Sequence, residues 1–527
     1  MDTYREDNMP YYDAEIPRHL RTRRKMIGSP NRMLYIVIAV LLFGVFLTFI
    51  NIFELRRLQG HHGSYGSAIV EGGGMADKIQ PIVWINAKNI HSGYLDHVLA
   101  VFSRIGYMRG TESSDWDVLW SHDYPFSKLR DVIQNIKPHQ RVNHFPGSGF
   151  ITNKVSLALS PLKHIPRAFK MPADRDALLM YAKEHPDTMW VQKSNNHRGV
   201  KITKMQDLDL SADKTFIQQY VDHPFLIDGR RFDIGLYVVI TSINPLRLYV
   251  HDSEWLLRFC PHDYYPFDPT DTDKYVIGDD YTPTWQMQSL KQMHTELSYS
   301  HKDTLMNYLK MNGRDGAKLQ RMMYEGVLEV LLNKEEKLVE STNNYKSSLN
   351  FFEMVRFDYV LDDELNVYLM EVNMSPNLSS GHFKQNRLMY EQVMYSMLSL
   401  VGVARSTTIS FSQSGEIGQD MHMADMDLQV YNEECATDKC KYNCEPLVCK
   451  LCHRCLTPAN KVHLKYGAME HFNRRNFRRL FPVPLSQAAV SEWHPIEDPG
   501  FNNLSDANKM VTLWFNGKCM KDAAWCS

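Results

Sequence analysis

Three side chains suited to binding a hard cation, Asp358, Glu371 and Asn373, lie in a stretch that reads as a β-hairpin. Residues 352–361 and 367–372 are apolar, β-branched or aromatic runs typical of strands, joined by an acidic turn. A loop over residues 363–366 pairs Asp358 with Glu371, and Asn373 follows on the same face. Two carboxylates and a carboxamide oxygen suit Mg²⁺, which in turn suits the phosphates of ATP. A solvated strand face with alternating charge accounts for the same spacing.

The residues that close this hairpin, Glu-x-Asn-x-Ser-Pro-Asn from Glu371 to Asn377, favour the metal site. They resemble the closing metal-binding motif of the tubulin tyrosine ligase-like family, ATP-grasp enzymes that attach amino acids to carboxyl or amino groups of proteins. Asp358, Glu371 and Asn373 match the three metal ligands of that family. The resemblance covers roughly residues 80–400.

Two upstream stretches resemble the phosphate-binding motifs of the family. Residues 142–147, Val-Asn-His-Phe-Pro-Gly, precede a lysine that can reach a phosphate as a point charge. Residues 190–202 resemble a strand, a phosphate-binding lysine and a glycine loop whose amides approach phosphate oxygens closely. In that loop Ser194 and Lys201 replace a proline and a second glycine. The phosphate-binding candidates are Lys154, Lys193, Arg198 and Gly199.

Residues 216–221, Phe-Ile-Gln-Gln-Tyr-Val, resemble the hinge strand whose backbone groups read the adenine edge. Backbone contacts depend little on the side chains, so this stretch can serve although a glutamine stands where the family has lysine. The adenine-binding candidates are Gln218, Gln219, Tyr220 and Val221.

Residues 226–238 resemble the Lys-Phe-Asp-Leu-Arg-x-Tyr-Val core of the family. Arg231 keeps the charge of the lysine, and Asp233 is retained, so both are further cofactor-binding candidates. Gly235 stands where the family has an arginine that contacts phosphate and amino-acid substrate. A strand glycine supplies no guanidinium.

Two residues further along the chain are the catalytic candidates. Arg258 falls at a substrate-arginine position of the family, and Thr295 falls in its His-x-Thr-Asn-Tyr-Ser stretch. There Glu296 replaces the asparagine, and an added carboxylate near a triphosphate is unfavourable unless a metal or an arginine offsets it. The resemblance therefore predicts an intact metal site with altered walls around the substrate.

The resemblance implies an α+β ATP-grasp fold, with a small N-terminal α/β domain and two lobes that hold ATP between antiparallel sheets. In the implied reaction ATP phosphorylates a carboxylate, and an amine then attacks the acyl phosphate to give an amide. The implied cofactors are ATP and Mg²⁺. Lys154, Lys193 and Arg231 would hold phosphates, and the three hairpin residues would hold the metal.

An uncharged run of 21 residues, Met33–Phe53, follows a cluster of six basic residues. As a helix it reaches about 31 Å, close to the ~30 Å hydrocarbon core of a bilayer, so we expect a transmembrane anchor. A signal peptide would have a shorter apolar region and a cleavage site, and a buried core helix is the remaining alternative. Six basic residues before the run against two after it predict a single-pass type II protein whose main domain is lumenal or extracellular. A cytosolic domain is the other orientation.

The composition is that of a globular protein, with 44% hydrophobic residues. Lysine and arginine (59) nearly balance aspartate and glutamate (61), so no global field favours nucleic acid as a partner. The predicted segments are a basic tail (1–32), the anchor (33–53), a flexible spacer (54–78), the ATP-grasp domain (79–400), a linker (401–430) and a cysteine-rich tail (431–527).

Eight of the nine cysteines lie beyond residue 430. Cys449, Cys452 and Cys455, with Cys444 and His453 nearby, have spacing compatible with zinc. An even number of cysteines beyond a predicted anchor favours disulfides in an oxidising lumen. In the same tail Asn503 begins a glycosylation sequon. The arginines of residues 474–479 are interpreted as a solvated helix face, or as a site for an acidic peptide such as a tubulin tail.

Together these features predict an ATP- and Mg²⁺-dependent ligase that adds glutamate to tubulin or another acidic protein. Two alternatives stay open. Gly235 and Glu296 favour a membrane-tethered pseudoenzyme that binds nucleotide without catalysis. Tubulin is cytosolic, whereas the charge bias and the cysteines favour a lumenal domain, which would make a secretory protein the acceptor.

Overall fold

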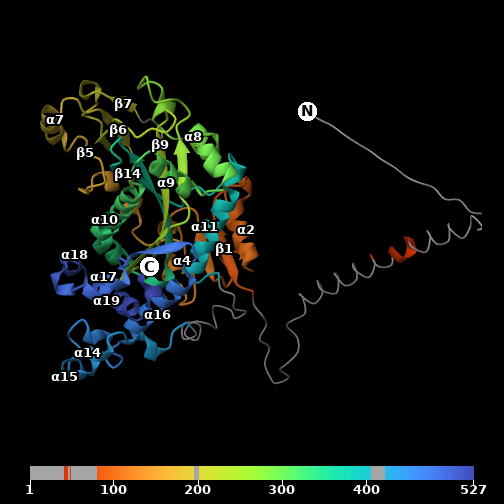
Figure 1. The fold of residues 1–527 in the computed structure, drawn as a ribbon, viewed down its shortest axis with the longest axis vertical. Helices are drawn as coiled ribbons and strands as arrows, with labels where there is room; N and C mark the ends of the chain where they lie inside the picture. Colours follow the sequence, from red (N-terminus) through yellow and green to blue (C-terminus); the bar gives the residue numbers. More distant parts are fainter. Residues whose placement is uncertain (1–40, 45–47, 49–79, 195–200, 405–421) are drawn as a thin grey trace, which may run out of the picture. The chain divides into compact units, whose positions relative to one another are not determined.

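The computed structural model describes residues 41–44, 48, 80–194, 201–404 and 422–527 (Figure 1). The chain divides into two units, Met1–Asp77 and Lys78–Ser527. Of the predicted anchor only residues 41–44 and 48 are described, and they are helical; the basic tail and the spacer lie outside the described residues. Within the described ranges, no helix combines the length and the apolarity needed to cross a bilayer.

The second unit begins with a small parallel sheet in the order β2-β1-β3-β4. Its two central strands are short and largely buried, since both carry runs of apolar residues. Helix α2 buries Val98, Val101 and Phe102 against this sheet. The elements are β1 Ile82–Asn86, α2 Asp96–Arg104, β2 Met108–Gly110, β3 Val118–Ser121, α3 Pro125–Lys128, α4 Arg130–Gln134 and β4 Arg141–Val142.

A second, antiparallel sheet has the order β5-β8-β6-β7. Its apolar face packs on α7 around the fully buried Trp190, with Phe169, Leu178 and Ile217. Figure 1 shows this lobe at one end of the unit, in yellow. The elements are α5 Gly149–Thr152, α6 Lys154–Ala158, β5 Ala168–Lys170, α7 Arg175–Glu184, β6 Trp190–Ser194, β7 Lys201–Thr203 and β8 Thr215–Gln219.

The central sheet has seven strands and is organised around β9, whose 12 residues are all buried. β13 pairs along one edge of β9, while β11 and then β10 pair along the other. β12, β14 and β15 extend the sheet outward. The strands are β9 Phe232–Ile243, β10 Leu246–His251, β11 Leu256–Phe259, β12 Thr282–Pro283, β13 Glu353–Leu361, β14 Val367–Met374 and β15 Phe477–Phe481.

Both faces of the central sheet are covered, because successive residues of β9 point to opposite sides. Leu236 and Val238 join the core that includes α10, whereas Tyr237 and Val239 join the core that includes α11. Helices α10 and α11 thus cover opposite faces of the sheet, and α11 lies beside α2 (Figure 1). The helices are α8 Gln288–Lys291, α9 His301–Met311, α10 Gly316–Thr342 and α11 Arg387–Leu400.

The hairpin of β13 and β14 pairs Asp358 with Glu371, as predicted, but by a different register at the turn. Leu361, not Asp362, lies opposite Val367, and an irregularity between Asp358 and Tyr359 shifts the register by one residue. A β-bulge of this kind changes which residues are opposite one another beyond it. The bulge therefore restores the pairing of the two carboxylates next to the site.

The segment after residue 422 packs on the central sheet and forms its own core with α19 at the centre. The end of the predicted linker belongs to that core, since Met423, Leu428 and Val430 are buried in it. β15 pairs antiparallel with β10 and so adds a strand to the central sheet. The helices are α14 Asn432–Ala436, α15 Asp438–Tyr442, α16 Pro458–Asn473, α17 Gln487–Glu492, α18 Pro499–Asn502 and α19 Asp506–Lys521.

A buried ion pair joins this C-terminal segment to the sheet. Arg247 on β10 donates through Nε and Nη2 to the two oxygens of Glu470 on α16, at 2.8 and 3.0 Å. The Tyr249 hydroxyl donates to the same carboxylate at 3.0 Å. Arg247 has no exposed surface and Glu470 is 2% exposed. Because buried charges are tolerated only when paired, this contact fixes the position of α16 on the sheet.

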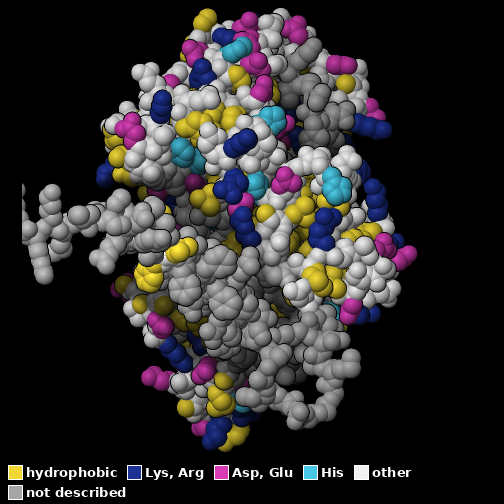
Figure 2. Space-filling model, turned by 90° about the vertical axis from the view of Figure 1, so that its right-hand side faces the viewer, with side chains coloured by type: hydrophobic (Ala, Val, Ile, Leu, Met, Phe, Trp, Pro, Cys, Tyr) yellow, Lys and Arg dark blue, Asp and Glu magenta, His cyan; other side chains and the backbone are white. Residues whose placement is uncertain are grey.

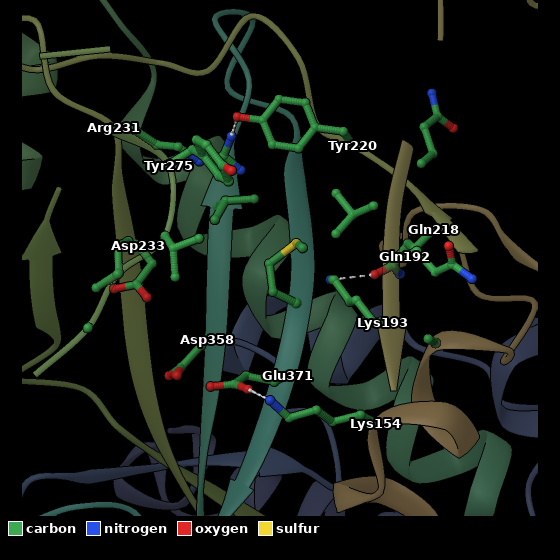
Figure 3. Close-up of a pocket in the computed structure, with 18 of the residues that line it drawn as sticks. Lys154, Gln192, Lys193, Gln218, Tyr220, Arg231, Asp233, Tyr275, Asp358 and Glu371 are labelled. Carbon is green, nitrogen blue, oxygen red and sulfur yellow. Dashed lines mark hydrogen bonds and ion pairs between the residues drawn. The ribbon is translucent and has the colours of Figure 1, made fainter. Parts of the chain in front are cut away.

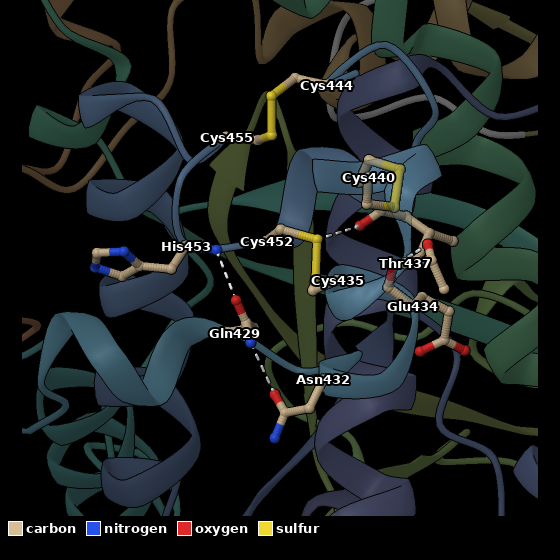
Figure 4. Close-up of a disulfide and its surroundings, with 12 residues drawn as sticks. Gln429, Asn432, Glu434, Cys435, Thr437, Cys440, Cys444, Cys452, His453 and Cys455 are labelled. Atoms are coloured by element: carbon tan, nitrogen blue, oxygen red, sulfur yellow. Dashed lines mark hydrogen bonds between the residues drawn. A yellow bond between two sulfur atoms is a disulfide. The ribbon is translucent and has the colours of Figure 1, made fainter. Parts of the chain in front are cut away.

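All eight C-terminal cysteines form disulfides, which confirms that interpretation and makes the zinc alternative wrong. Figure 4 shows the bridges among residues 435–455. Three bridges hold the short helices α14 and α15 to the turn that precedes α16. The fourth ties the end of α19 to the last turn of the chain. The pairs are Cys435–Cys452, Cys440–Cys449, Cys444–Cys455 and Cys519–Cys526.

The interpretation of residues 474–479 as a solvated helix face is wrong, because the chain leaves α16 near Arg474 and enters β15. Arg479 is 2% exposed, lies 4.0 Å from the ring centre of Phe515 and donates to the carbonyls of Pro482 and Trp525. The open edge of β10 supplies backbone partners that the local sequence pattern does not reveal.

The described surface mixes charges of both signs. Figure 2 shows Lys and Arg side chains interspersed with Asp and Glu over one face. This distribution accords with the near balance of 59 basic and 61 acidic residues. On the described part of that face, long-range steering by a single-sign field is not expected.

We expect Glu470→Ala to lower the free energy of unfolding by about 3–5 kcal/mol, because it leaves the buried Arg247 without its carboxylate. Urea denaturation of the full chain, followed by tryptophan fluorescence, measures this. The exposed Glu492 on α17 offers a control, and Glu492→Ala should change stability by less than about 0.5 kcal/mol. Equal stability of the two variants would contradict the structural role of the C-terminal segment.

Candidate active site

A cavity of about 600 Å³ lies between the β5-β8-β6-β7 sheet and the central sheet (Figure 3). One wall comes from β6 and β8, and the other from β9, β11, β13 and β14. A cavity between two antiparallel sheets is what the predicted fold requires. Ten predicted site residues line it: Lys154, Lys193, Gln218, Gln219, Tyr220, Arg231, Asp233, Arg258, Asp358 and Glu371.

Local structure places Lys154 at the first residue of α6. The Asn153 side chain caps this helix by accepting from the amides of Val155 and Ser156 at 3.1 and 3.0 Å. Upstream, the buried Glu353 at the start of β13 contacts His144 Nδ1 at 3.0 Å and accepts from the Phe145 amide at 3.0 Å. The motif at residues 142–147 thus ties the loop that leads to Lys154 to the central sheet.

Two of the three predicted metal ligands, Asp358 and Glu371, line the cavity, and the third, Asn373, bonds to both from beside it. Asn373 Nδ2 donates to Asp358 Oδ2 at 2.8 Å and to Glu371 Oε1 at 3.0 Å. Lys154 Nζ lies 3.0 Å from Glu371 Oε2. Burial opposes ionisation of Glu371, but the charge of Lys154 and the hydrogen bonds from Asn373 and Lys154 outweigh it and lower its pKa to about 2. Glu371 is therefore a carboxylate at neutral pH.

Asp358 is held by two guanidinium groups. Arg356, two residues earlier on β13, donates through Nε to Oδ1 at 2.6 Å and through Nη2 to Oδ2 at 2.9 Å. Arg258 on β11 donates from Nη2 to Asp358 Oδ2 at 2.9 Å and also forms a two-bonded pair with Asp233 on β9, at 3.0 and 2.6 Å. Positive and negative side chains thus alternate across three paired strands.

The opposite side of the cavity presents cations whose hydrogen-bond partners among the described residues are neutral. Lys193 Nζ donates to Gln218 Oε1 at 2.9 Å. Arg231 donates from Nη1 to the Tyr220 hydroxyl and to the Val221 carbonyl, and its Nε is buried without a partner in the described part of the chain. Because no carboxylate neutralises these two contacts, the arrangement suits phosphate oxygens.

The amides of the hinge are partly committed within the protein. The backbone N–H groups of Gln219 and Tyr220 donate to the carbonyls of Arg167 and Met189, at 2.8 and 2.9 Å. These two amides therefore do not serve an adenine edge. The Gln218 side chain bridges Lys193 and the Pro166 carbonyl, so it orients the lysine.

Some predicted residues are not brought to the cavity. Thr295 and its neighbour Glu296 are exposed on a π-helical turn, Gln292–Glu296, and neither is among the described residues that line the cavity. Solvent screens the Glu296 carboxylate there, so the predicted repulsion does not act at the site. Arg198 and Gly199 lie outside the described residues.

Two features of the site were missed from the sequence. Arg356 stands two residues before Asp358, and the period-two rule for strands places both on one face, so this signal was present. The segment of residues 275–279 lines the cavity and brings Tyr275 and Ile277 to it. This segment carries no motif, and only the tertiary fold places it there.

The residues present fit a bound Mg²⁺. Asp358 and Glu371 offer carboxylate oxygens, and Asn373, whose Nδ2 donates to both of them, would offer its Oδ1 after a turn of the amide. Such an all-oxygen set is of the kind that Mg²⁺ prefers. The neighbouring Lys154 and Lys193 suit the phosphates that Mg²⁺ accompanies. Both oxygens of Asp358 accept hydrogen bonds from arginines, so the orientation of this carboxylate toward a metal depends on Arg258 and Arg356.

A cavity between two antiparallel sheets, with converging carboxylates at one end and lysines beside them, defines an ATP-grasp-like site. The sequence profile of the tubulin-tyrosine ligase family matches residues 133–410. The chain belongs to this family, whose members are ATP-dependent ligases that form amide bonds.

Three relatives show how far the similarity extends. A protein from Caenorhabditis elegans named probable tubulin polyglutamylase ttll-15 is 41% identical over 486 residues, which cover 90% of this chain and 89% of the relative. Mouse tubulin polyglutamylase TTLL6 is 26% identical over 60% of this chain and 40% of its own length. Human tubulin polyglutamylase TTLL7 is 26% identical over 55% of this chain and 36% of its own length. Since the worm similarity leaves out only a tenth of the chain, it reaches into the segment beyond the family profile.

We expect nucleotide affinity to depend on the protonation of Lys193. Burial, followed by the charge of Lys154, lowers the pKa of Lys193 to about 8. The lysine therefore loses its charge as the pH rises through that value, and ADP binding without metal should weaken by about tenfold for each pH unit above it. Calorimetric titration between pH 7 and 9.5 measures the effect.

Two variants separate this effect from other titrations. Lys193→Arg keeps its charge and should give a flat profile over the same range. Lys170→Arg, at an exposed position of β5 in the same sheet, should preserve the loss of affinity. A flat profile in the unaltered chain would show that Lys193 is not the phosphate-binding cation.

Proposed function

We propose that the chain is an ATP- and Mg²⁺-dependent ligase that adds glutamate to tubulin. The observation that carries the proposal is the convergence of Asp358, Glu371 and Asn373 at a cavity that Lys154 and Lys193 also line. Relatives named tubulin polyglutamylases support glutamate as the added amino acid and tubulin as its acceptor.

The residues of the cavity have distinct roles in this proposal. Lys193 and Arg231 bind phosphates, and Lys154 pairs with Glu371. Asp358, Glu371 and Asn373 would hold Mg²⁺, which when bound neutralises phosphate charge in the transfer step. Arg258 is held by Asp233 and Asp358 at the side of the cavity where an anionic acyl group would lie.

The alternative of a nucleotide-binding pseudoenzyme rested on Gly235 and Glu296. Glu296 is exposed and away from the cavity lining. Gly235 is covered by the Arg356 side chain, so a guanidinium is present beside it. Both departures from the family pattern thus leave the charges of the cavity in place, which weakens the case for a binding module without catalysis.

Glu371→Gln should lower ATP-dependent incorporation of glutamate into tubulin by about 100-fold or more, because it removes a charged metal ligand and the partner of Lys154. Radiolabelled glutamate transfer by the full chain measures this. Glu364→Gln changes an exposed glutamate in the turn of the same hairpin and should retain activity. Equal transfer by the Glu371 variant would remove the proposal.

A second acceptor class is favoured by the four disulfides. Disulfides form and persist in oxidising compartments, where tubulin is not found. Together with the basic residues that precede Met33, they support a single-pass type II protein with its ligase domain in the lumen or outside the cell. In that case a secretory protein is the acceptor, whereas a cytosolic domain keeps tubulin in first place.

Protease protection in intact microsomes distinguishes the two orientations. If the domain is lumenal, it should resist digestion until detergent is added, and a secretory protein replaces tubulin as the acceptor. We also expect glycosidase to increase its mobility through loss of a glycan at Asn503, which is exposed at the end of α18. Asn503→Gln is the matched control and should remove the part of the mobility shift that comes from this sequon, while Asn377, an exposed residue that begins another sequon, is unchanged. Digestion without detergent, together with free thiols in the C-terminal segment, would contradict the lumenal orientation.

A further inference from the structure

The space above Gly235 is filled by the side chain of Arg356. β9 and β13 run side by side, and Gly235 lies opposite Asp358 in their register. A Cβ atom built at Gly235 would lie 2.8 Å from Arg356 Cδ, 3.2 Å from its Nε and 3.2 Å from the Leu256 Cβ. Since real Cβ contacts below 3.0 Å are essentially absent, any side chain at 235 must displace the arginine.

Arg356 in turn binds the carboxylate of Asp358, one of the predicted metal ligands. The arginine is 5% exposed, and it donates two hydrogen bonds to the Asp358 carboxylate, one to each oxygen. A planar guanidinium that binds both oxygens fixes the plane and the direction of a carboxylate, which a lysine cannot do. Asp358 is itself 2% exposed, so without such a partner it would be a buried charge shared with Asp233 over the single Arg258.

From this geometry we propose that Arg356 and Gly235 act as a pair. Arg356 is the positioning residue that aims the Asp358 carboxylate toward the metal, and Gly235 is the position that makes room for it. The guanidinium that the strand lacks at residue 235 is delivered from the neighbouring strand instead. This inference rests on the proposed Mg²⁺-nucleotide site but assigns a role that no motif of the chain reveals.

Replacing Gly235 alone with arginine would therefore not supply the site with a usable guanidinium. Gly235→Arg would force two arginines into one space, and even Gly235→Ala places a methyl group against Arg356 Cδ. A test must change both residues together. The reciprocal double variant Gly235→Arg/Arg356→Gly moves the guanidinium from one strand to the other while keeping the number of charges.

The experiment measures the ADP affinity of the full chain by calorimetry with Mg²⁺ and with EDTA, and takes the ratio of the two dissociation constants. Arg356→Met should reduce the Mg²⁺-dependent gain by at least about tenfold, the size of effect expected when a group that orients a metal ligand is lost. Arg356→Lys should recover only part of it, because one ammonium group cannot hold both oxygens. Gly235→Ala should also reduce it. The reciprocal double variant should regain the ratio to within about threefold of the unaltered chain.

Arg247→Met is the matched control. Like Arg356, Arg247 lies on the central sheet and holds a buried carboxylate through two hydrogen bonds, but its partner Glu470 is not among the residues that line the cavity. The control variant should lower the melting temperature and leave the ratio unchanged. If Arg356→Met behaves in the same way, or if the double variant is no better than Arg356→Gly, the inference is overturned. A chain that binds Mg²⁺-ADP with this dependence on Arg356 but transfers no glutamate removes the proposed ligase function and leaves the inference standing. Absence of any Mg²⁺ dependence in the unaltered chain removes both.

Discussion

The alternation of charge along Asp233, Arg258, Asp358 and Arg356 is the interaction on which the rest of the site depends. These four side chains come from β9, β11 and β13, and each inner member contacts a neighbour of opposite sign on both sides. A buried carboxylate is stable only when its charge and its lone pairs are satisfied. The sheet must therefore hold these strands in one register, because a slip of one residue would point every member to the other face.

That requirement explains why β9 is buried along its whole length and covered on both faces. Two helical layers, one with α10 and one with α2 and α11, exclude water from the strand that carries Asp233 and Gly235. Exclusion of water strengthens each hydrogen bond of the charge network and makes an unpaired member costly. The C-terminal segment also stabilises this sheet, since β15 pairs with β10 at its edge and Glu470 neutralises the buried Arg247.

The sequence predicted the hairpin and the convergence of its carboxylates because both follow from local rules. Strand periodicity and the turn bring Asp358 opposite Glu371, although the register was reached through a bulge that no local signal marks. The packing of the C-terminal segment, the strand at residues 477–481 and the cavity segment at 275–279 depend on partners far away in sequence, so periodicity could not reveal them.

At Gly235 the chain lacks the arginine of the family motif, and a comparison made one position at a time interprets this as the loss of a guanidinium. A glycine in a central strand weakens it and provides no side chain, so on its own it reads as a defect. In three dimensions the missing volume is occupied by Arg356, whose own position attracts no notice because an arginine two residues before an aspartate is an ordinary strand pattern. What the site needs is a guanidinium at one place in space, and two adjacent strands offer two ways to supply it. The unit that determines the chemistry here is therefore the pair of facing positions, and its members make physical sense only together.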